Sequence, residues 1–498
     1  MDNLIKNLIK QKKFSYQKLL TAKLIYARKN KQPLPRNSEI LGIYKTMLAK
    51  KKIKASKRFE ELLRLKKIRT LSGVSPVAVL TKPYPCPGRC IYCPTQKNMP
   101  KSYLSDEPAV LRANALDFAA YKQVKFRLTQ YEAIGHTPEK IELIVMGGTW
   151  SALPKDYRIK FISDCFRACN NSGELPFELQ QQLNEKAKYR IIGLTLETRP
   201  DYINESEIKF MRFLGATRVE LGVQSIYDDV LALVKRGHKV ADTIKATKLL
   251  KDAGFKICYH LMPNLPGSNL KKDLEMFKIV YKDERFKPDM VKIYPCVVTK
   301  QAELNNWYQA GKFKPYRDKE LTDLLVKIKK ITPQWVRINR LGRDIPISNI
   351  TGGCKISNIR QLLKTNCRCI RCREIRNSKS EIRNPKLKII TYQASGGSEY
   401  FLQYVDSKNR LYSLLRLRIT GQAIIREVHT YGQALAIRQL AEGNIQHSGL
   451  GKKLIERAEK IAKTKSFKKI SVISGVGVRD YYCQLGYHLA DTYMVKLL

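Results

Sequence analysis

Apolar residues recur along this chain in two different patterns, and the change between them predicts where domains begin and end. From about residue 71 to residue 300, short apolar runs alternate with longer stretches whose apolar positions are spaced as on one helix face. This alternation predicts an α/β domain over residues 71–330, whose parallel strands curl into an incomplete barrel of six β/α units. Strands are expected at residues 77–80, 141–146, 190–196, 218–223, 255–261 and 290–294.

The last part of the chain lacks this alternation, because its apolar runs follow one another closely. Strands are expected there at residues 387–393, 399–406, 411–419 and 423–430, before a helix that ends near residue 464. The pattern predicts an α+β domain over residues 389–498, separate from the barrel.

The N-terminal residues 1–70 predict an arm of short basic helices. Their apolar residues keep helical spacing, as at Ile40, Tyr44 and Met47, while 21 lysines and arginines face only four acidic residues. Such helices are suited to binding the phosphates of a nucleic acid. The alternative is a helical face that only carries solvated charge.

Charge and cysteine content narrow the class of protein. The chain has 93 Lys and Arg against 44 Asp and Glu, a net charge of +49 in 498 residues, which favours a polyanionic partner over a merely basic surface. Twelve cysteines in so long a chain are not a disulfide framework. Lysines interrupt the N-terminus too early for a signal peptide, and no apolar run could span a bilayer, so a cytoplasmic protein is expected.

Three cysteines follow the first predicted strand of the barrel. Cys86, Cys90 and Cys93 lie on a loop rich in proline and glycine, where three thiolates can converge on one metal centre. Three ligands suit a 4Fe–4S cluster whose fourth iron stays open for S-adenosylmethionine. The alternative is a zinc site completed by a distant residue.

Other unusual residues also follow barrel strands. Because chemistry in such barrels is located at the carboxyl ends of the strands, these residues predict one site on that face. They are Gly147, Gly148 and Thr149 after the second strand, Glu197 at the third, Gln224 at the fourth and His260 at the fifth.

Residues 331–388 predict a basic linker that contains a second group of cysteines. Cys367, Cys369 and Cys372 need one more ligand for tetrahedral zinc, and Cys296 is the candidate, with Cys354 as the alternative. An auxiliary iron–sulfur cluster or simple reduced thiols remain the competing interpretations.

A Q-x-x-G-x-G motif precedes the helix of the C-terminal domain. Gln446, Gly449, Gly451 and Lys452 place small residues at a helix start, where backbone N–H groups can bind a pyrophosphate. Together with the Tyr481–Tyr482 pair downstream, the motif favours the acetyl-coenzyme A fold of GNAT acetyltransferases. A plain ferredoxin-like core is the alternative.

Several stretches of sequence resemble one family along nearly the whole chain. They lie at residues 81–86, 103–108, 146–149, 193–201, 220–225, 236–238 and 471–479. They are similar to the catalytic subunit of Elongator, in the single-chain form of bacteria and archaea. That family joins a radical S-adenosylmethionine barrel to a GNAT domain and modifies the wobble uridine of tRNA.

The resemblance implies a reaction. A radical derived from S-adenosylmethionine takes a hydrogen from the methyl group of acetyl-coenzyme A, and the carbon radical adds to carbon 5 of uridine 34. Hydrolysis of the thioester then leaves 5-carboxymethyluridine. The implied partners are a tRNA anticodon stem-loop and an external one-electron donor, with no membrane, and a homodimer is left open.

The resemblance also implies roles for residues of this sequence. Cys86, Cys90 and Cys93 would hold the 4Fe–4S cluster. The S-adenosylmethionine contacts would be Gly147, Gly148, Thr149, Glu197, Gln224 and His260. The acetyl-coenzyme A contacts would be Gln446, Gly449, Gly451, Lys452, Tyr481 and Tyr482. The candidates for the thioester chemistry are Tyr481, Tyr482 and Lys155. Because the acetyl group must enter the barrel, the two domains are expected to pack against each other.

Two other classes of protein stay open from the sequence. One is a protein lysine acetyltransferase in which the barrel is a regulatory iron–sulfur domain. The other is a tRNA-binding protein with a vestigial cluster, although all three barrel cysteines and both glycines of the second motif are present.

Overall fold

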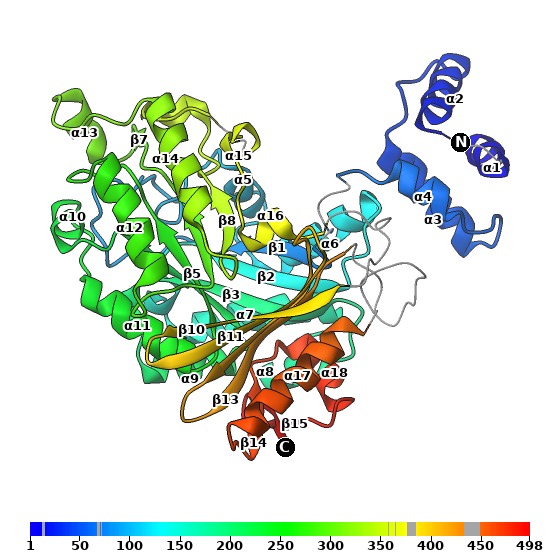
Figure 1. Ribbon diagram of the computed structural model, residues 1–498. Coiled ribbons are helices and arrows are strands. Elements are labelled where there is room, and N and C mark those ends of the chain that lie inside the picture. Colours follow the sequence, from blue (N-terminus) through cyan, green and yellow to red (C-terminus); the bar gives the residue numbers. More distant parts are fainter. Residues whose placement is uncertain are drawn as a thin grey trace.

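The computed structural model divides into a helical arm, a barrel and a C-terminal sheet (Figure 1). It describes residues 1–11, 15–66, 70, 72–356, 358–363, 365–375, 385–432 and 449–498. Within these ranges, no helix is both long and apolar enough to cross a bilayer.

Seven parallel strands form the barrel sheet, and they follow one another in chain order. Alternate side chains of each strand point to opposite faces of the sheet. In the fourth strand, Val219, Leu221 and Val223 face the covering helices and are fully buried in the main core. The strands are β1 (Ser75–Leu80), β2 (Lys140–Met146), β3 (Arg190–Thr198), β4 (Arg218–Gln224), β5 (Lys256–Leu261), β6 (Met290–Ile293) and β8 (Arg337–Leu341). The incomplete parallel barrel expected from the sequence is confirmed, and six of its strands lie where they were predicted.

The seventh strand, β8, was not predicted and lies inside the segment assigned to the linker. It pairs with β6 in parallel, with Val291 opposite Ile338. Ile338 is buried on the outer face, while Arg337 and Asn339 occupy the alternate positions. A short strand with polar inward residues has no apolar run, so the sequence showed only its basic character.

Helices cover the outside of the barrel. They are α5 (Pro108–Asn114), α6 (Ala120–Ala133), α7 (Lys155–Asn170), α8 (Phe177–Asn184), α9 (Glu205–Phe213), α10 (Asp228–Leu233), α11 (Val240–Asp252), α12 (Leu270–Lys282), α13 (Leu304–Gln309) and α14 (Asp318–Ile331). Short 3₁₀ turns lie at η2 (Trp150–Ala152), η3 (Pro200–Tyr202) and η4 (Ile347–Asn349). A small antiparallel pair, β7 (Val298–Thr299) with β9 (Ile350–Gly352), and the short helices α15 (Ile359–Leu362) and α16 (Ile370–Arg373) complete this part.

The C-terminal part is an α+β domain, as the sequence predicted, and its strands form one mixed sheet. Its elements are β10 (Lys386–Ala394), β11 (Gly397–Val405), β12 (Leu411–Ile419), β13 (Ala423–Thr430), α17 (Leu450–Thr464), β14 (Lys469–Val472), η5 (Val476–Val478), α18 (Arg479–Cys483), β15 (His488–Ala490) and β16 (Tyr493–Leu497). The neighbours β13 and β14 run parallel, and the other neighbouring strands are antiparallel.

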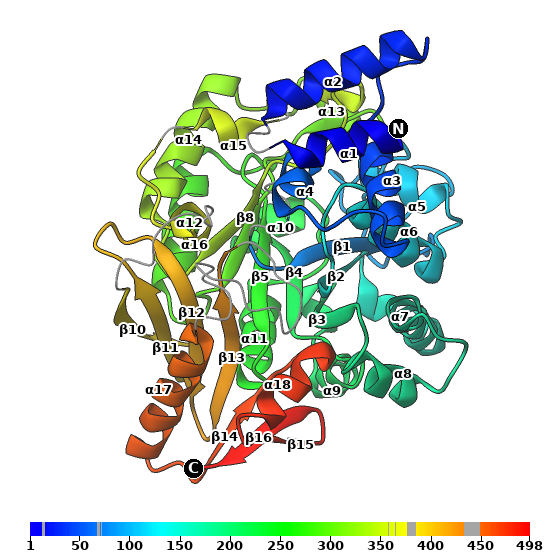
Figure 2. The ribbon, with the colours of Figure 1, turned by 90° about the vertical axis from the view of Figure 1, so that its right-hand side faces the viewer.

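The basic arm has its own small core and projects from the barrel (Figures 1 and 2). Its helices are α1 (Asp2–Lys10), α2 (Tyr16–Lys29), α3 (Asn37–Ala49) and α4 (Lys57–Leu63). Tyr44 and Phe59 are buried between them with ring centroids 5.1 Å apart. Near α6, Lys45 Nζ donates to the Glu132 carbonyl oxygen at 2.7 Å, and Arg64 Nε donates to that of Gly135 at 2.9 Å.

The C-terminal sheet packs on the amino ends of the barrel strands. The turn that contains η5 lies directly on β3, because a Cβ at Gly475 would fall 2.2 Å from the Ile192 carbonyl oxygen and one at Gly477 2.6 Å from Arg190 Cβ. Only glycine permits this approach. The two domains do pack against each other as expected, but the contact is at the end of the barrel opposite the cysteine loop.

A buried group of charged residues lies between the barrel and the C-terminal sheet; we call it the junction network. It consists of Lys251, Asp252 and Asp289 from the barrel with Glu399, Arg416, Arg418 and Arg426 from the sheet.

Asp289 is the centre of the junction network. Arg426 Nη2 lies 2.6 Å from Asp289 Oδ2, and Arg416 Nη1 lies 3.4 Å from Oδ1. Burial by itself raises the pKa of Asp289, but the positive charges of Arg426, Lys251 and Arg416 reverse this effect and hold it well below its usual range. Asp289 is therefore ionised and joins the two domains.

Replacing Asp289 tests the junction network. Asp289→Asn leaves three buried cations with less compensation, so we expect the free energy of unfolding to fall by about 3–5 kcal/mol in urea titrations. The matched control is Asp283→Asn, whose carboxylate pairs with the exposed Arg285, and it should lose less than about 1 kcal/mol. Equal losses in the two variants would contradict the role given to the network.

Candidate functional site

The three barrel cysteines lie on the loop after β1, at the carboxyl end of the sheet. The Gly88 N–H donates to Cys86 Sγ at 3.4 Å, and Arg236 Nη1 donates to Cys90 Sγ at 3.7 Å. A Cβ on Gly88 would lie 2.6 Å from Arg199 Nη1, so the glycine leaves room for this guanidinium beside the loop.

The spread of these sulfur atoms distinguishes between the two metal centres considered for them. Four thiolates on one zinc ion at about 2.3 Å lie roughly 4 Å from one another. Among the described residues, the groups of three potential ligands with atoms within 4.8 Å of one another are Cys367/Cys369/Cys372 and Glu220/Cys258/His260. Cys86, Cys90 and Cys93 are more widely spread, which favours a cluster of several metal ions over a single one.

The loop after β2 completes the surroundings of the cysteines. Gly147 has φ of +132°, and a Cβ there would lie 2.0 Å from Thr81 Oγ1, so the turn requires glycine. Thr149 Oγ1 lies 3.9 Å from Cys86 Sγ. The predicted Gly147, Gly148 and Thr149 edge therefore lies beside the cysteine loop.

A cavity of about 130 Å³ opens next to this loop, at the same end of the barrel. Predicted residues from three different strands, Glu197, Gln224 and His260, lie in its wall. Its other charged or phenolic lining residues are Tyr92, Tyr103, Glu107, Lys292, Tyr294, Arg340, Arg343 and Asp344. The strand ends that sequence analysis placed on one face do meet there.

Several polar atoms at this end are buried without a protein partner in the described part of the chain. They include Thr81 Oγ1, Arg199 Nη1 and Gln224 Oε1. Since buried polar groups are normally hydrogen-bonded, these atoms fit a site that receives a polar ligand. Gln224 also has a left-handed backbone, with φ of +67°, as strained functional residues often do.

A buried ionic group, centred on Glu220, lies in the barrel interior under the cavity. His260 Nε2 lies 2.9 Å from Glu220 Oε2, and the Lys292 ammonium donates to the same oxygen. Burial raises the pKa of Glu220, but Lys292 and His260 outweigh it and hold the pKa well below its usual range. The nearby Cys258 completes a set of three potential metal ligands, yet the ammonium of Lys292 already supplies the positive charge that this set requires.

Sequence analysis missed Glu220, Lys292 and the residues on the far wall of the cavity. Arg343 there donates to Ser102 Oγ at 2.9 Å and lies 3.3 Å from Glu107 Oε1, while the Tyr103 hydroxyl donates to Glu197 Oε2 at 3.4 Å. Single charged residues within apolar strands were the available signal for Glu220 and Lys292. Arg343 and Glu107 had none, because they come from separate loops.

In the C-terminal sheet, Gly449 and Gly451 lie at the start of α17, beside Tyr481 and β13; we call this region the α17 cradle. Gly449 caps the helix with φ of +78°. A Cβ on Gly451 would lie 3.5 Å from the Tyr481 hydroxyl, 3.6 Å from Thr430 Oγ1 and 3.8 Å from Val428 Cγ1. The glycine thus keeps the helix start close to Tyr481 and to β13.

The other residues predicted for this region differ in their placement. Lys452 is exposed on the first turn of α17, and Gln446 lies outside the described residues. Tyr482 is buried in the core under α17, whereas Tyr481 is 39% exposed. Lys155 is exposed at the start of α7, where its ammonium lies 5.3 Å from the centroid of the Phe210 ring, and it does not line the cavity.

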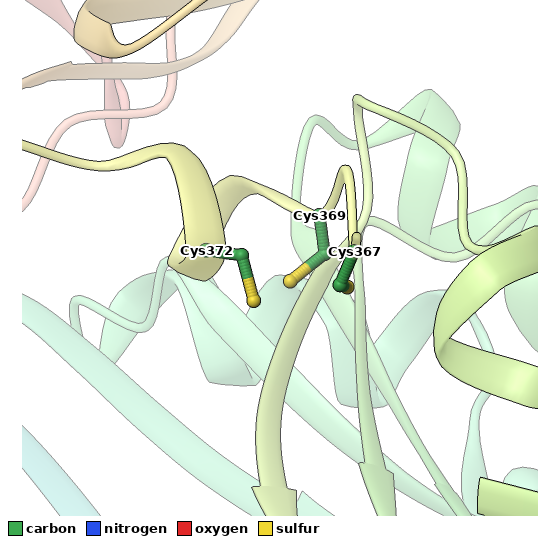
Figure 3. A group of neighbouring side chains, drawn as sticks. All are labelled: Cys367, Cys369 and Cys372. Carbon is green, nitrogen blue, oxygen red and sulfur yellow. The ribbon is translucent and has the colours of Figure 1, made fainter. Parts of the chain in front are cut away.

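The linker cysteines form a compact group at the start of α16 (Figure 3). The sulfur atoms of Cys367, Cys369 and Cys372 all lie within 4.8 Å of one another. Hydrogen bonds from Cys367 and Cys372 lower the pKa of the Cys369 thiol, whereas the pKa values of the Cys367 and Cys372 thiols are raised. The predicted fourth ligand, Cys296, is not in this group: it is buried among Ile91, Val298 and their neighbours, near the barrel cysteines. Cys354 is not in the group either.

Comparison with known proteins first defines a class. Residues 84–280 match the family model of the radical SAM superfamily, and residues 288–368 match the radical SAM C-terminal domain. The chain is thus a member of the radical SAM superfamily, in agreement with its parallel barrel and its cysteine loop.

The relatives then define the particular family. The chain is 45% identical over 496 residues to the tRNA uridine(34) acetyltransferase of Methanocaldococcus jannaschii. The matched region covers 93% of this chain and 90% of that protein. It is 36% identical to human Elongator complex protein 3 over 88% of this chain and 86% of that one. The solved structure of Methanocaldococcus infernus Elp3 with an N-terminal deletion is 43% identical, with a TM-score of 0.75, and covers 86% of this chain and 100% of that one. The chain belongs to the family of these tRNA uridine(34) acetyltransferases and Elongator complex protein 3.

The buried ion pair between Glu220 and Lys292 predicts how the stability of the fold depends on pH. Lys292→Met leaves Glu220 buried without its ammonium, so the free energy of unfolding at pH 7 should fall by about 3–5 kcal/mol. In the wild type, the lowered pKa of Glu220 stabilises the fold at pH values above the pKa that this carboxyl has in the unfolded chain. In the variant, burial without the ammonium raises the pKa of Glu220 instead. The deficit should therefore shrink when urea titrations are repeated at pH 5.

The matched control for this experiment is Lys272→Met, whose ammonium pairs with the exposed carboxylate of Asp229. That variant should lose less than about 1 kcal/mol at either pH. A deficit of the Lys292 variant that grows on acidification would contradict the assignment.

Proposed function

We propose that this chain is a tRNA uridine(34) acetyltransferase that uses radical S-adenosylmethionine chemistry, with 5-carboxymethyluridine as its product. The observation that carries the proposal is that one chain holds both an open cysteine loop beside a polar cavity and an acetyl-coenzyme A-type cradle. Full-length similarity to tRNA uridine(34) acetyltransferases supports it.

The superfamily implies a 4Fe–4S cluster and S-adenosylmethionine, and the residues of the loop fit them. Cys86, Cys90 and Cys93 would hold the cluster, which when loaded supplies a 5′-deoxyadenosyl radical from S-adenosylmethionine. The guanidinium of Arg236 and the N–H of Gly88 donate hydrogen bonds to the sulfur atoms of Cys90 and Cys86.

The cavity beside the loop would bind S-adenosylmethionine and admit the uracil ring. Glu197 is the proposed partner for its polar groups, because its carboxylate faces the cavity between Tyr103 and His260. Lys292 and Arg340 add positive charge to the wall, which suits a ligand or nucleotide that carries negative charge. The target base must leave its stack to reach a cavity of this kind.

The acetyltransferase family name implies acetyl-coenzyme A, and the α17 cradle fits it. Gly449, Gly451 and Lys452 would bind its pyrophosphate at the helix start. Tyr481, whose hydroxyl faces Gly451, is the proposed contact near the thioester, whereas buried Tyr482 would support the cradle from the core. The acetyl group would become the carboxymethyl group of the product.

The basic arm and the linker would bind the tRNA. Arm helices that share a small apolar core of their own and expose lysines suit phosphate contacts, which are independent of sequence. Three sulfur atoms of the linker would hold a structural zinc ion, since their spacing fits a single ion.

Loss of one barrel cysteine tests the radical chemistry. Anaerobic incubation of the reconstituted wild type with tRNA, S-adenosylmethionine, acetyl-coenzyme A and a one-electron reductant should give 5-carboxymethyluridine by nucleoside mass spectrometry. Cys90→Ala should abolish this product and 5′-deoxyadenosine, because a cluster ligand is missing, while tRNA affinity stays within about twofold.

The control for that experiment is Cys483→Ala, which removes an exposed thiol outside the barrel. Product formation by Cys90→Ala at the wild-type rate would refute the radical assignment. Acetylation of protein lysines without any modified uridine would favour the alternative function of a lysine acetyltransferase.

The proposed zinc ion is tested by elemental analysis. The purified protein should contain about one zinc per chain besides iron, and Cys369→Ser should lose the zinc and melt at a lower temperature, because metal binding contributes to folding. Cys483→Ser should keep the metal and the melting temperature. A protein with iron alone, and unchanged melting of Cys369→Ser, would refute the zinc site.

A further inference from the structure

Strands β13 and β14 pair in parallel over only a short stretch, and β13 continues beyond it. Only Ile424 and Ile425 of β13 pair with β14, so the strand continues from Arg426 to Thr430 without β14 beside it. On one face of this free segment, Val428 and Thr430 line the cradle under Gly451. The residue between them, His429, therefore points to the opposite face of the strand.

His429 lies on that other face, at the amino end of the barrel. Its Nε2 is 2.7 Å from the carbonyl oxygen of Ser72, which lies just before β1. A carbonyl oxygen only accepts, so Nε2 carries the hydrogen and donates it. The same contact holds the ring in one orientation, as a second group orients the base in many hydrolytic sites.

The other ring nitrogen of His429 is available. In the described part of the chain, no hydrogen bond reaches Nδ1, and the side chain is half-buried rather than enclosed. With Nε2 protonated, Nδ1 of the neutral ring carries a lone pair that can take a proton from water. The ring of Tyr431 packs against it, with centroids 4.4 Å apart, and restricts its motion further.

The charges around His429 come from four strands. Glu427 lies on β13 itself. Lys256 and Arg337 are the first residues of β5 and β8, and Glu142 is the third residue of β2, so all three lie at the amino end of the barrel. Burial lowers the pKa of His429, Glu427 raises it, and Arg337 and Lys256 lower it again, with a net decrease from 6.5. The imidazole is therefore neutral at pH 7, the form in which it can act as a base.

We infer that His429 is the general base that activates water for thioester hydrolysis, an inference that rests on the proposed function. Nδ1 takes a proton from water while the water oxygen attacks the thioester carbonyl carbon. The carbon–sulfur bond then breaks, and the coenzyme A sulfur leaves with the proton that His429 returns. The products are a carboxylic acid, which ionises, and free coenzyme A. No oxidant or reductant takes part in this step.

Substitution by glutamine separates the catalytic role from a structural one. The side-chain amide of His429→Gln can still donate to the Ser72 carbonyl oxygen, but it offers no basic nitrogen. We expect 5′-deoxyadenosine to form within about threefold of the wild type, while coenzyme A release falls by about a hundredfold or more. A tRNA that still carries the coenzyme A thioester on its uridine should then accumulate and be visible by mass spectrometry.

The pH dependence provides a second readout. In the wild type, coenzyme A release should decrease below about pH 6.5 as His429 takes up a proton and stops acting as a base. His429→Gln should lose this acid limb. The control is His488→Gln on the exposed strand β15, which should match the wild type in rate and in pH profile.

Two results would overturn the inference. One is coenzyme A release by His429→Gln at the wild-type rate. The other is a parallel fall of 5′-deoxyadenosine and coenzyme A release with no thioester adduct, which would assign His429 a structural role. Failure of the proposed function itself differs from both, because the wild type would then form neither 5′-deoxyadenosine nor modified uridine.

Discussion

The structure depends on the junction network, which fixes the C-terminal sheet on the amino end of the barrel. Ionic groups buried this deeply are costly unless every charge has a partner, and here Asp289 and Glu399 lie between cations of both domains. Because such contacts tolerate little displacement, the network determines how the α17 cradle is oriented toward the barrel. Glycines in the turn around η5 allow the same close approach on the side of β3.

A chain of charged contacts then runs through the barrel interior, from the sheet toward the cysteine end. Barrel interiors are usually filled by branched apolar residues, but here Arg218 contacts Glu142 and lies 3.8 Å from Glu220. Glu220 in turn contacts His260, which lies 3.5 Å from Glu197 in the cavity wall. The cavity and the C-terminal sheet lie at opposite ends of barrel strands about seven residues long, which at roughly 3.3 Å per residue separates the two ends by roughly 20 Å. During the reaction, the acetyl group, the tRNA or both must therefore move across that length.

The sequence was sufficient for what depends on local patterns. Apolar runs located six barrel strands, and glycines and cysteines beside strand ends identified residues that meet at one face. It was insufficient wherever distant segments decide the outcome. Strand β8 was hidden by its polar inward residues, and Cys296 was assigned to the linker cysteines although folding buries it near the barrel loop. Tyr481 and Tyr482 looked equivalent until α18 placed one in the core and the other toward Gly451.

The central claim is that the barrel and the C-terminal sheet act on the same acetyl group. The most direct measurement uses acetyl-coenzyme A with a trideuterated methyl group in the complete anaerobic reaction with tRNA. The account predicts deuterium in the 5′-deoxyadenosine that forms, and two deuterium atoms in the carboxymethyl group of the modified uridine. Modified uridine accompanied by 5′-deoxyadenosine free of deuterium would contradict it, because the radical formed at the barrel would then not have reacted with the acetyl group held by the sheet.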